Sequence, residues 1–170
     1  MLDRLIDDHR QFDGLLCALD TLLQPVPPRG RDADTEALDQ RQALAALAER
    51  VRSYPDALHH RIETALFDML VNKGLKPAEQ RLIQRNLAEH GEIFMATDAA
   101  AAALESGVQQ TSGLDDLDRA ALSSYVSLQR RHMAREEDQL FPIAASLLDS
   151  EDWRSLEQFA RALIVELEAT

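Results

Sequence analysis

The chain has 170 residues, 45% of them hydrophobic, which favours a folded domain with a sizeable core over a disordered segment. Its 18 basic and 30 acidic residues give a formal net charge of −12, which disfavours nucleic acid or an anionic membrane as a partner. No apolar run reaches membrane-spanning length, the N-terminus lacks a signal-peptide pattern, and a single cysteine suits a reducing compartment. We therefore expect a cytoplasmic protein, whose oligomeric state the composition leaves open.

Apolar residues recur with helical spacing in each predicted element, and no segment shows the alternation of apolar and polar residues that is typical of a strand. The apolar positions predict a first helix over residues 2–23, which ends before the proline-rich stretch 25–30. A second helix is predicted over about 35–72, with a kink or local break at Pro55. A third begins at Pro77. Its predicted inner stripe consists of Ile83, Leu87, His90, Phe94, Thr97, Ala101 and Leu104.

Two more helices are predicted in the C-terminal part. The fourth covers about 114–148, and after Glu136 its stripe continues through Leu140, Ile143 and Leu147. A short last helix is predicted to begin at Ser150, which would act as its N-cap. The resulting fold class is all-α: an antiparallel up-down four-helix bundle over residues 1–148, with an appended helix over 149–170 packing on it.

Two His-x-x-x-Glu pairs stand out within these helices. His59 and Glu63 are four residues apart, so on a helix they share one face about a turn apart. His132 and Glu136 repeat this spacing in the fourth helix. One such pair arises by chance in many helices, but two pairs among only five histidines point to a shared site.

Two further histidines, His9 and His90, lie within the apolar stripes of the first and third helices. Mid-helix positions of an antiparallel bundle meet at one level, where unpaired polar groups would cost several kcal/mol. A metal resolves this cost because it takes the imidazole lone pairs and neutralises the carboxylates. The predicted metal ligands are His9, His59, Glu63, His90, His132 and Glu136.

The types of donor atom limit which metal ions the site can bind. Imidazole and carboxylate without thiolate suit iron, zinc, copper or nickel, and fit calcium or magnesium poorly. Two glutamates can bridge a pair of metals roughly 3.5–4 Å apart, with histidines as terminal ligands. The Glu-x-x-His pairs of ferritin-like bundles are absent from the sequence, so the scheme is a different one.

Two neighbouring residues compete with this ligand set. His60 has the polar helical neighbours Ser53, Asp56 and Thr64, so we expect it to face solvent or to support the outer shell. Glu137 is an alternative to Glu136 as the fourth-helix carboxylate. The spacing of Glu136 from the apolar positions favours Glu136. Glu89 and Glu92 are predicted to form a solvated face.

These residues also carry a family resemblance. Its pieces are Asp8-His9, the stretch from Tyr54 to His60 followed by Glu63, Glu89-His90, and the stretch from His132 to Pro142. Over about residues 1–148 the chain resembles bacterial hemerythrin-like proteins, also called HHE cation-binding domains. The resemblance implies an up-down four-helix bundle holding a non-haem di-iron centre that meets oxygen, nitric oxide or peroxide.

The chain departs from the oxygen-carrying hemerythrins at two positions. Four residues after the histidine that corresponds to His90, those carriers have a further histidine, whereas this chain has Phe94. In the fourth helix, the carriers have an aspartate five residues after the histidine, whereas Glu136 lies four residues after His132. The ligand set is more similar to that of di-iron proteins implicated in the repair of iron–sulfur centres.

Three functions follow as hypotheses. The first is a protein with two carboxylate-bridged iron ions that binds or reduces a small oxidant in a stress response or iron-centre repair, with a redox protein as a further partner. Manganese and zinc are the substitute metals. The second is iron storage, delivery or sensing without turnover. The third is a metal-free helical adaptor.

Overall fold

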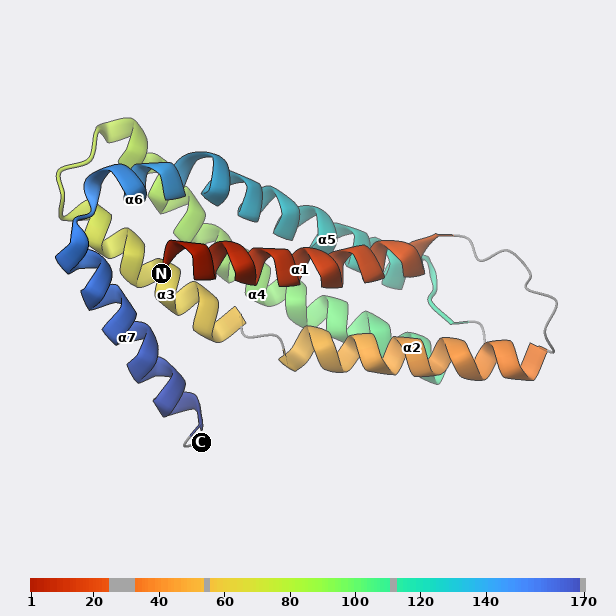
Figure 1. Cartoon of the computed structure of the whole chain (residues 1–170). Coiled ribbons are helices and arrows are strands. Elements are labelled where there is room, and N and C mark those ends of the chain that lie inside the picture. The colour runs from red at the N-terminus through yellow and green to blue at the C-terminus, as the bar shows by residue number, and fades with distance from the viewer. Residues whose placement is uncertain (25–32, 54–55, 111–112, 169–170) are drawn as a thin grey trace. The chain divides into compact units, whose positions relative to one another are not determined.

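The computed structural model describes residues 1–24, 33–53, 56–110 and 113–168, and these residues are helical apart from short turns and caps (Figure 1). The all-α prediction is confirmed, with no strand in the described ranges. The up-down bundle order stays a prediction. In chain order the elements are α1 (Leu2–Leu23), α2 (Ala33–Ser53), α3 (Asp56–Val71), α4 (Pro77–Gln109), α5 (Asp116–Arg135), the π-helix η1 (Glu136–Leu140), α6 (Phe141–Leu147) and α7 (Ser150–Glu168).

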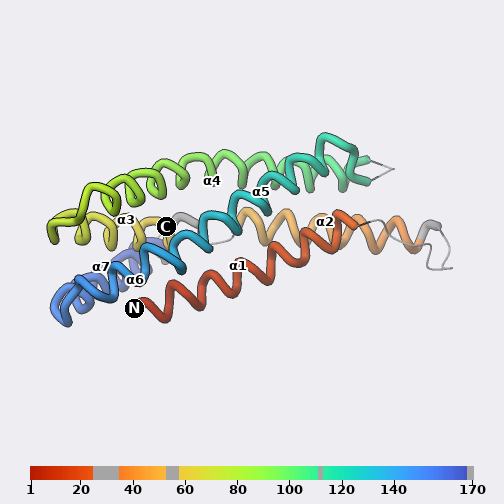
Figure 2. Tube along the Cα trace, turned by 90° about the horizontal axis from the view of Figure 1, so that it is seen from above, coloured from red at the N-terminus to blue at the C-terminus, as the bar shows by residue number. Residues whose placement is uncertain are grey.

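Several helix boundaries differ from the sequence prediction. The helix expected over 35–72 is two helices, α2 and α3; Pro55, where we expected the interruption, lies outside the described residues. The predicted fourth helix is the succession of α5, η1 and α6, which follow one another without a break (Figure 2). None of the helices in the described ranges combines the length and apolar character needed to cross a bilayer.

The chain forms two compact units, to both of which α1, α4 and α5 contribute. The first unit comprises Met1–Arg10, Pro55–Gly91 and Arg131–Thr170, and the second comprises Gln11–Tyr54 and Glu92–Arg130. The core of the first unit is built from α3, the start of α1, the start of α4 and the C-terminal elements. Its buried side chains are Leu5, Ile62, Leu66, Phe67, Leu70, Leu75, Ile83, Leu140, Phe141, Ala144, Leu148, Leu156, Ala160 and Leu163.

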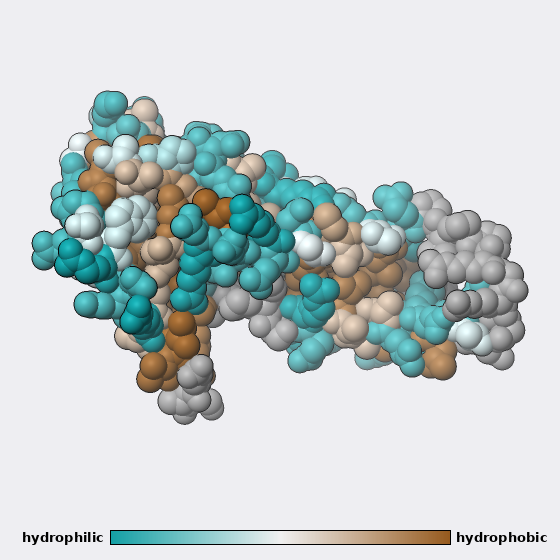
Figure 3. All heavy atoms as spheres, viewed as in Figure 1, coloured by the Kyte–Doolittle hydropathy of each residue, from teal (hydrophilic) through white to brown (hydrophobic). Residues whose placement is uncertain are grey.

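Within the first unit, α7 packs against α3 through one apolar face. Its N-cap is Asp149 rather than the predicted Ser150: the Asp149 carboxylate accepts hydrogen bonds from the backbone N–H groups of Glu151 (2.8 Å) and Asp152 (3.1 Å). The Asp152 carboxylate accepts the Asp149 N–H at 2.9 Å in return, which completes a reciprocal cap. The outer part of α7 leaves apolar side chains on the surface, as Figure 3 shows near its C-terminal end.

Candidate metal centre

Helix α3 provides three adjacent polar side chains to one site in the first unit. Glu63 lies four residues after His59 and three after His60, so both histidines neighbour it on the helix surface. His59 is 2% exposed and Glu63 is completely buried, while His60 is half-buried. The helix therefore places a carboxylate between two imidazoles, on the side of α3 that faces the interior.

The first of two donor groups consists of His9, His59, Glu63 and Glu136, all of them buried. Their potential ligand atoms lie within 4.8 Å of one another. Glu63 Oε1 is 2.9 Å from His59 Nε2 and 3.5 Å from His9 Nε2. Glu136 Oε2 is 3.3 Å from His9 Nε2. Two imidazoles and two carboxylates from three elements, α1, α3 and η1, thus converge on one point.

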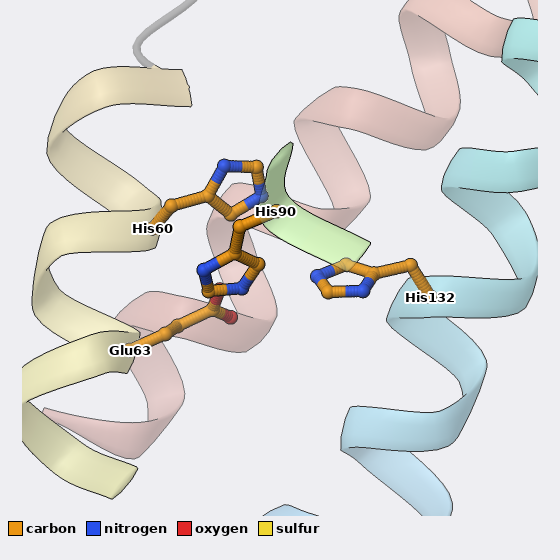
Figure 4. Close-up of side chains that lie close together, drawn as sticks. All are labelled: His60, Glu63, His90 and His132. Carbon is orange, nitrogen blue, oxygen red and sulfur yellow. The ribbon is translucent and has the colours of Figure 1, made fainter. Parts of the chain in front are cut away.

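The second donor group consists of His60, Glu63, His90 and His132, which come from α3, α4 and α5 and point toward one another (Figure 4). The potential ligand atoms of this group also lie within 4.8 Å of one another. Glu63 Oε2 is 3.5 Å from His90 Nε2. Glu136 is not part of this group, but its Oε1 atom is 3.3 Å from His132 Nε2.

The two glutamates each face both groups. Glu63 directs Oε1 toward His9 and His59 and Oε2 toward His90. Glu136 directs Oε2 toward His9 and Oε1 toward His132. A carboxylate whose two oxygens face different donor groups has the arrangement needed to bridge a pair of cations.

Buried atoms without hydrogen-bond partners test whether this donor set fits a metal. Among the described residues, such atoms include both carboxylate oxygens of Glu63, one of Glu136, and the Nε2 atoms of His90 and His132. Two of them, Glu63 Oε2 and His90 Nε2, lie 3.5 Å apart, within ion-pair distance but without hydrogen-bond geometry. Because burying such groups costs free energy unless they are partnered, and because they are imidazole and carboxylate donors, the residues fit a transition-metal ion.

An outer set of acids fixes the orientation of the histidine rings. The Nδ1 atoms of three histidines each lie near one carboxylate oxygen: His9 near Glu137 (2.8 Å), His59 near Asp8 (3.3 Å) and His132 near Glu89 (3.3 Å). A carboxylate that accepts the Nδ1 proton leaves the Nε2 lone pair directed into the site, which is the usual arrangement around metal-binding histidines.

Amide and guanidinium groups hold the acids in turn. Asn86 is completely buried, and its Nδ2 donates to Glu136 Oε1 at 2.5 Å. Glu89 is only 8% exposed and accepts a hydrogen bond from Arg135 as well as one from Arg85 at 3.3 Å. The orientation of the inner side chains is therefore specified by a connected polar network that includes both helices α4 and α5.

The electrostatics of the site couple the imidazoles to the carboxylates. Burial would lower the pKa of His9, but the adjacent carboxylates of Glu136 and Glu63 raise it to about 9. Burial would also lower the pKa of His59, but Glu63 and Asp8 raise it to about 10. Burial would raise the pKa of Glu63, yet the charge of His59 and the closeness of the other histidines hold it well below its usual range. The carboxylates thus favour positive charge at this point, and a bound cation would supply that charge while releasing protons.

A short π-helix positions the fourth-helix carboxylate. Residue Glu136 is the first of η1 and is completely buried, whereas the side chain of Glu137 is 43% exposed. π-Helical turns are rare and occur frequently at functional sites. In this turn the two consecutive acids take different places, Glu136 inside the donor cluster and Glu137 against the outer nitrogen of His9.

Comparison with known families identifies the domain. The family described as Hemerythrin HHE cation binding domain matches residues 1–144. The chain belongs to this family. No match was found to a curated protein or to a solved structure. The resemblance seen in the sequence motifs is therefore confirmed, and the hemerythrin-like domain contains histidine and glutamate groups that could hold metal ions.

The hemerythrin-like site brings together the six residues predicted as ligands. All six belong to the two donor groups: His9, His59, Glu63, His90, His132 and Glu136. Their role as ligands stays a prediction. The structure places Glu136, rather than Glu137, among the inner donors, as the apolar spacing indicated.

Expectations about three neighbouring residues need correction. Of the two alternatives for His60, exposure to solvent is wrong: its ring stacks on His90, and although the side chain keeps some solvent contact, burial lowers its pKa to about 2. The other alternative, a supporting role around the ligands, stays a prediction. Glu89 is buried against His132 instead of forming a solvated face, although Glu92 is exposed as predicted. Phe94, expected on the inner stripe of α4, is 66% exposed. The spacing of His60 three residues before Glu63 was the signal that could have identified it.

Proposed function

We propose that this hemerythrin-like domain is a non-haem di-iron protein that binds or reduces a small oxidant such as oxygen, nitric oxide or peroxide. The observation that carries the proposal is the pair of donor groups that share Glu63, with one carboxylate oxygen of Glu63 directed to each group. Family membership supports iron, and the imidazole and carboxylate donors suit it, with manganese or zinc as substitutes.

Iron ions, when bound there, would supply redox chemistry and coordination positions for a small oxidant. The chain's own residues would hold the ions, with His9 and His59 on one side and His90 and His132 on the other, and with Glu63 and Glu136 between them. Asp8, Glu89 and Glu137 would keep the imidazole Nε2 atoms directed inward.

Apolar side chains help to keep water out of the site. The ring of Phe141 stacks on His9, with 5.5 Å between centroids, and Phe141 itself is 2% exposed. Both glutamates of the cluster are completely buried. A small uncharged molecule fits such an enclosed site better than a large polar substrate, and electrons for its reduction would come from a redox partner protein.

Metal content and reactivity test the proposal. The protein is loaded anaerobically with ferrous iron and freed of excess, and its iron is counted; absorption spectra are then taken in air and after reduction. We expect two irons per chain and near-ultraviolet absorption that disappears on reduction. Fewer than two irons after reconstitution would contradict the proposal, as would a spectrum unchanged by oxygen, nitric oxide and peroxide alike. Consumption of excess oxidant with a supplied reductant separates catalysis from storage or sensing, which react stoichiometrically.

A further inference from the structure

His60 lies inside the second donor group although the six-residue ligand set does not include it. Its ring stacks on His90, with 4.2 Å between centroids and 20° between planes, and meets His132 edge-on at 5.5 Å. One of its ring nitrogens lies within 4.8 Å of ligand atoms of Glu63, His90 and His132. In Figure 4 its imidazole points toward the same space as the other three side chains.

Helix geometry explains why two adjacent histidines serve different donor groups. His59 and His60 are separated by about 100° around α3, and both lie one turn before Glu63. His59 joins the first group, toward which Glu63 Oε1 is directed. His60 joins the second, toward which Glu63 Oε2 is directed. The tandem histidines therefore place one imidazole on each side of the shared carboxylate.

We propose that His60 is a ligand of the second metal ion and completes a three-histidine set with His90 and His132. The proposal rests on the two-metal function proposed above and deepens it. His60 would supply, from α3, the imidazole that oxygen-carrying hemerythrins take from the position occupied here by Phe94. The side chain of Phe94 is 66% exposed, so this position of α4 gives nothing to the site.

The consequence is an unequal pair of metal positions. The second ion would have three imidazoles, from His60, His90 and His132, whereas the first would have only those of His9 and His59. The shared carboxylates do not remove this difference. The ion at His9 and His59 would therefore have fewer protein ligands and more coordination positions open to a small exogenous molecule.

Two substitutions separate a ligand role from a packing role. His60→Gln removes the imidazole, and His60→Phe removes the nitrogen donors while keeping a flat ring that can stack on His90. Each full-length variant and the wild-type chain are titrated with Co²⁺ alone, in competition with a chelator. We expect the wild type to bind two ions. Both variants should bind one ion with normal affinity and the second more than about 100-fold more weakly. Such a loss exceeds the roughly 10–100-fold weakening that is usual when a residue that only hydrogen-bonds to a ligand is removed.

A second readout counts the coordinated histidines directly. In the Co²⁺-loaded protein each coordinated imidazole with a protonated outer nitrogen gives one paramagnetically shifted N–H signal. We expect one signal more in the wild type than in either variant when both metal positions are filled at high Co²⁺ concentration. Circular dichroism of the metal-free proteins checks that helical content is retained.

The possible results differ clearly. A second-site loss in His60→Gln but not in His60→Phe would assign His60 a packing role and overturn the proposal. Unchanged affinity and an unchanged number of signals in both variants would also overturn it, while two ions in the wild type would leave the two-metal function standing. A wild-type chain that binds fewer than two ions would overturn both.

Discussion

At the scale of single residues, Glu63 is the side chain on which two-metal binding depends, because one of its oxygens faces each donor group. Glu63→Gln keeps the size of the side chain but removes the charge and one oxygen donor. We expect metal content to fall from two ions per chain to at most one, measured after anaerobic ferrous reconstitution. The matched control is Glu92→Gln, which removes an exposed acid from α4 and should leave two ions bound. Two ions in Glu63→Gln would refute the bridging role.

Glu136 and Glu137 give a second test at the scale of single residues, because these adjacent acids contact different parts of the site. Glu136 is buried among the inner donors, so Glu136→Ala should abolish two-metal loading. Glu137 contacts only the outer nitrogen of His9 within the site, so Glu137→Ala should keep both ions and weaken the affinity by about 10–100-fold. Chelator competition measures both variants. The opposite pattern would make Glu137 the ligand.

The residues that the sequence identified and those it missed have a common explanation. Spacings of three and four residues relate side chains within one helix, and this sufficed to find His59 with Glu63 and His132 with Glu136. Contacts between helices depend on the rotation of each helix, which periodicity determines only approximately. Asn86 and Glu89 were therefore missed, although both are buried on α4 beside the site.

At the scale of elements, the same limit explains the stripes of α4 and of the C-terminal helices. On α4 the buried positions include Ile83, Asn86 and Ile93, so the inner face passes through residue 93 instead of the predicted Phe94. After Glu136 the predicted residue Leu140 is buried, but further along the chain the buried residues are Ala144 and Leu148 instead of Ile143 and Leu147. The π-turn adds one residue to the helix, which accounts for a shift of one position. Nothing in local propensity announces such an insertion.

The start of α7 offers a test of capping that is independent of the metal. Backbone N–H groups of Asp152 and Glu151 donate to Asp149 and hold the pKa of its carboxyl below the usual range, with help from Lys73. A lowered pKa in the folded state means that the charged form stabilises the protein above about pH 4, and that this contribution is lost as the pH falls through the folded-state pKa.

Asp149→Asn should therefore lower the melting temperature at pH 7, because it removes the stabilising negative charge. Asparagine is itself a good N-cap, so the substitution tests the charge and not the cap as such. The difference from the wild type should shrink as the pH falls below about 4. Thermal unfolding followed by circular dichroism at several pH values measures it. Asp98→Asn, which removes an exposed acid within α4, controls for the loss of one charge. A difference that is independent of pH would contradict the role of the ionised cap.

At the scale of the whole molecule, metal binding should stabilise one unit of the chain more than the other. Every residue of both donor groups belongs to the unit formed by Met1–Arg10, Pro55–Gly91 and Arg131–Thr170. A ligand that binds only the folded state stabilises it by about 2.7 kcal/mol at 100 times its dissociation constant. For a chain of this length that corresponds to a rise in melting temperature of roughly 5–10 °C.

Hydrogen exchange can locate this stabilisation. Adding ferrous iron anaerobically should slow amide exchange in α3, in η1 and in the parts of α1 and α4 that belong to the first unit, and should change exchange in α2 much less. Magnesium, which suits these donors poorly, serves as the control ion, and Glu63→Gln as the control variant. Equal protection of α2 and α3 would mean that the two units unfold together. A melting temperature and exchange pattern unaffected by iron or by chelation would favour a metal-free helical adaptor, because a filled buried site cannot avoid linkage to folding.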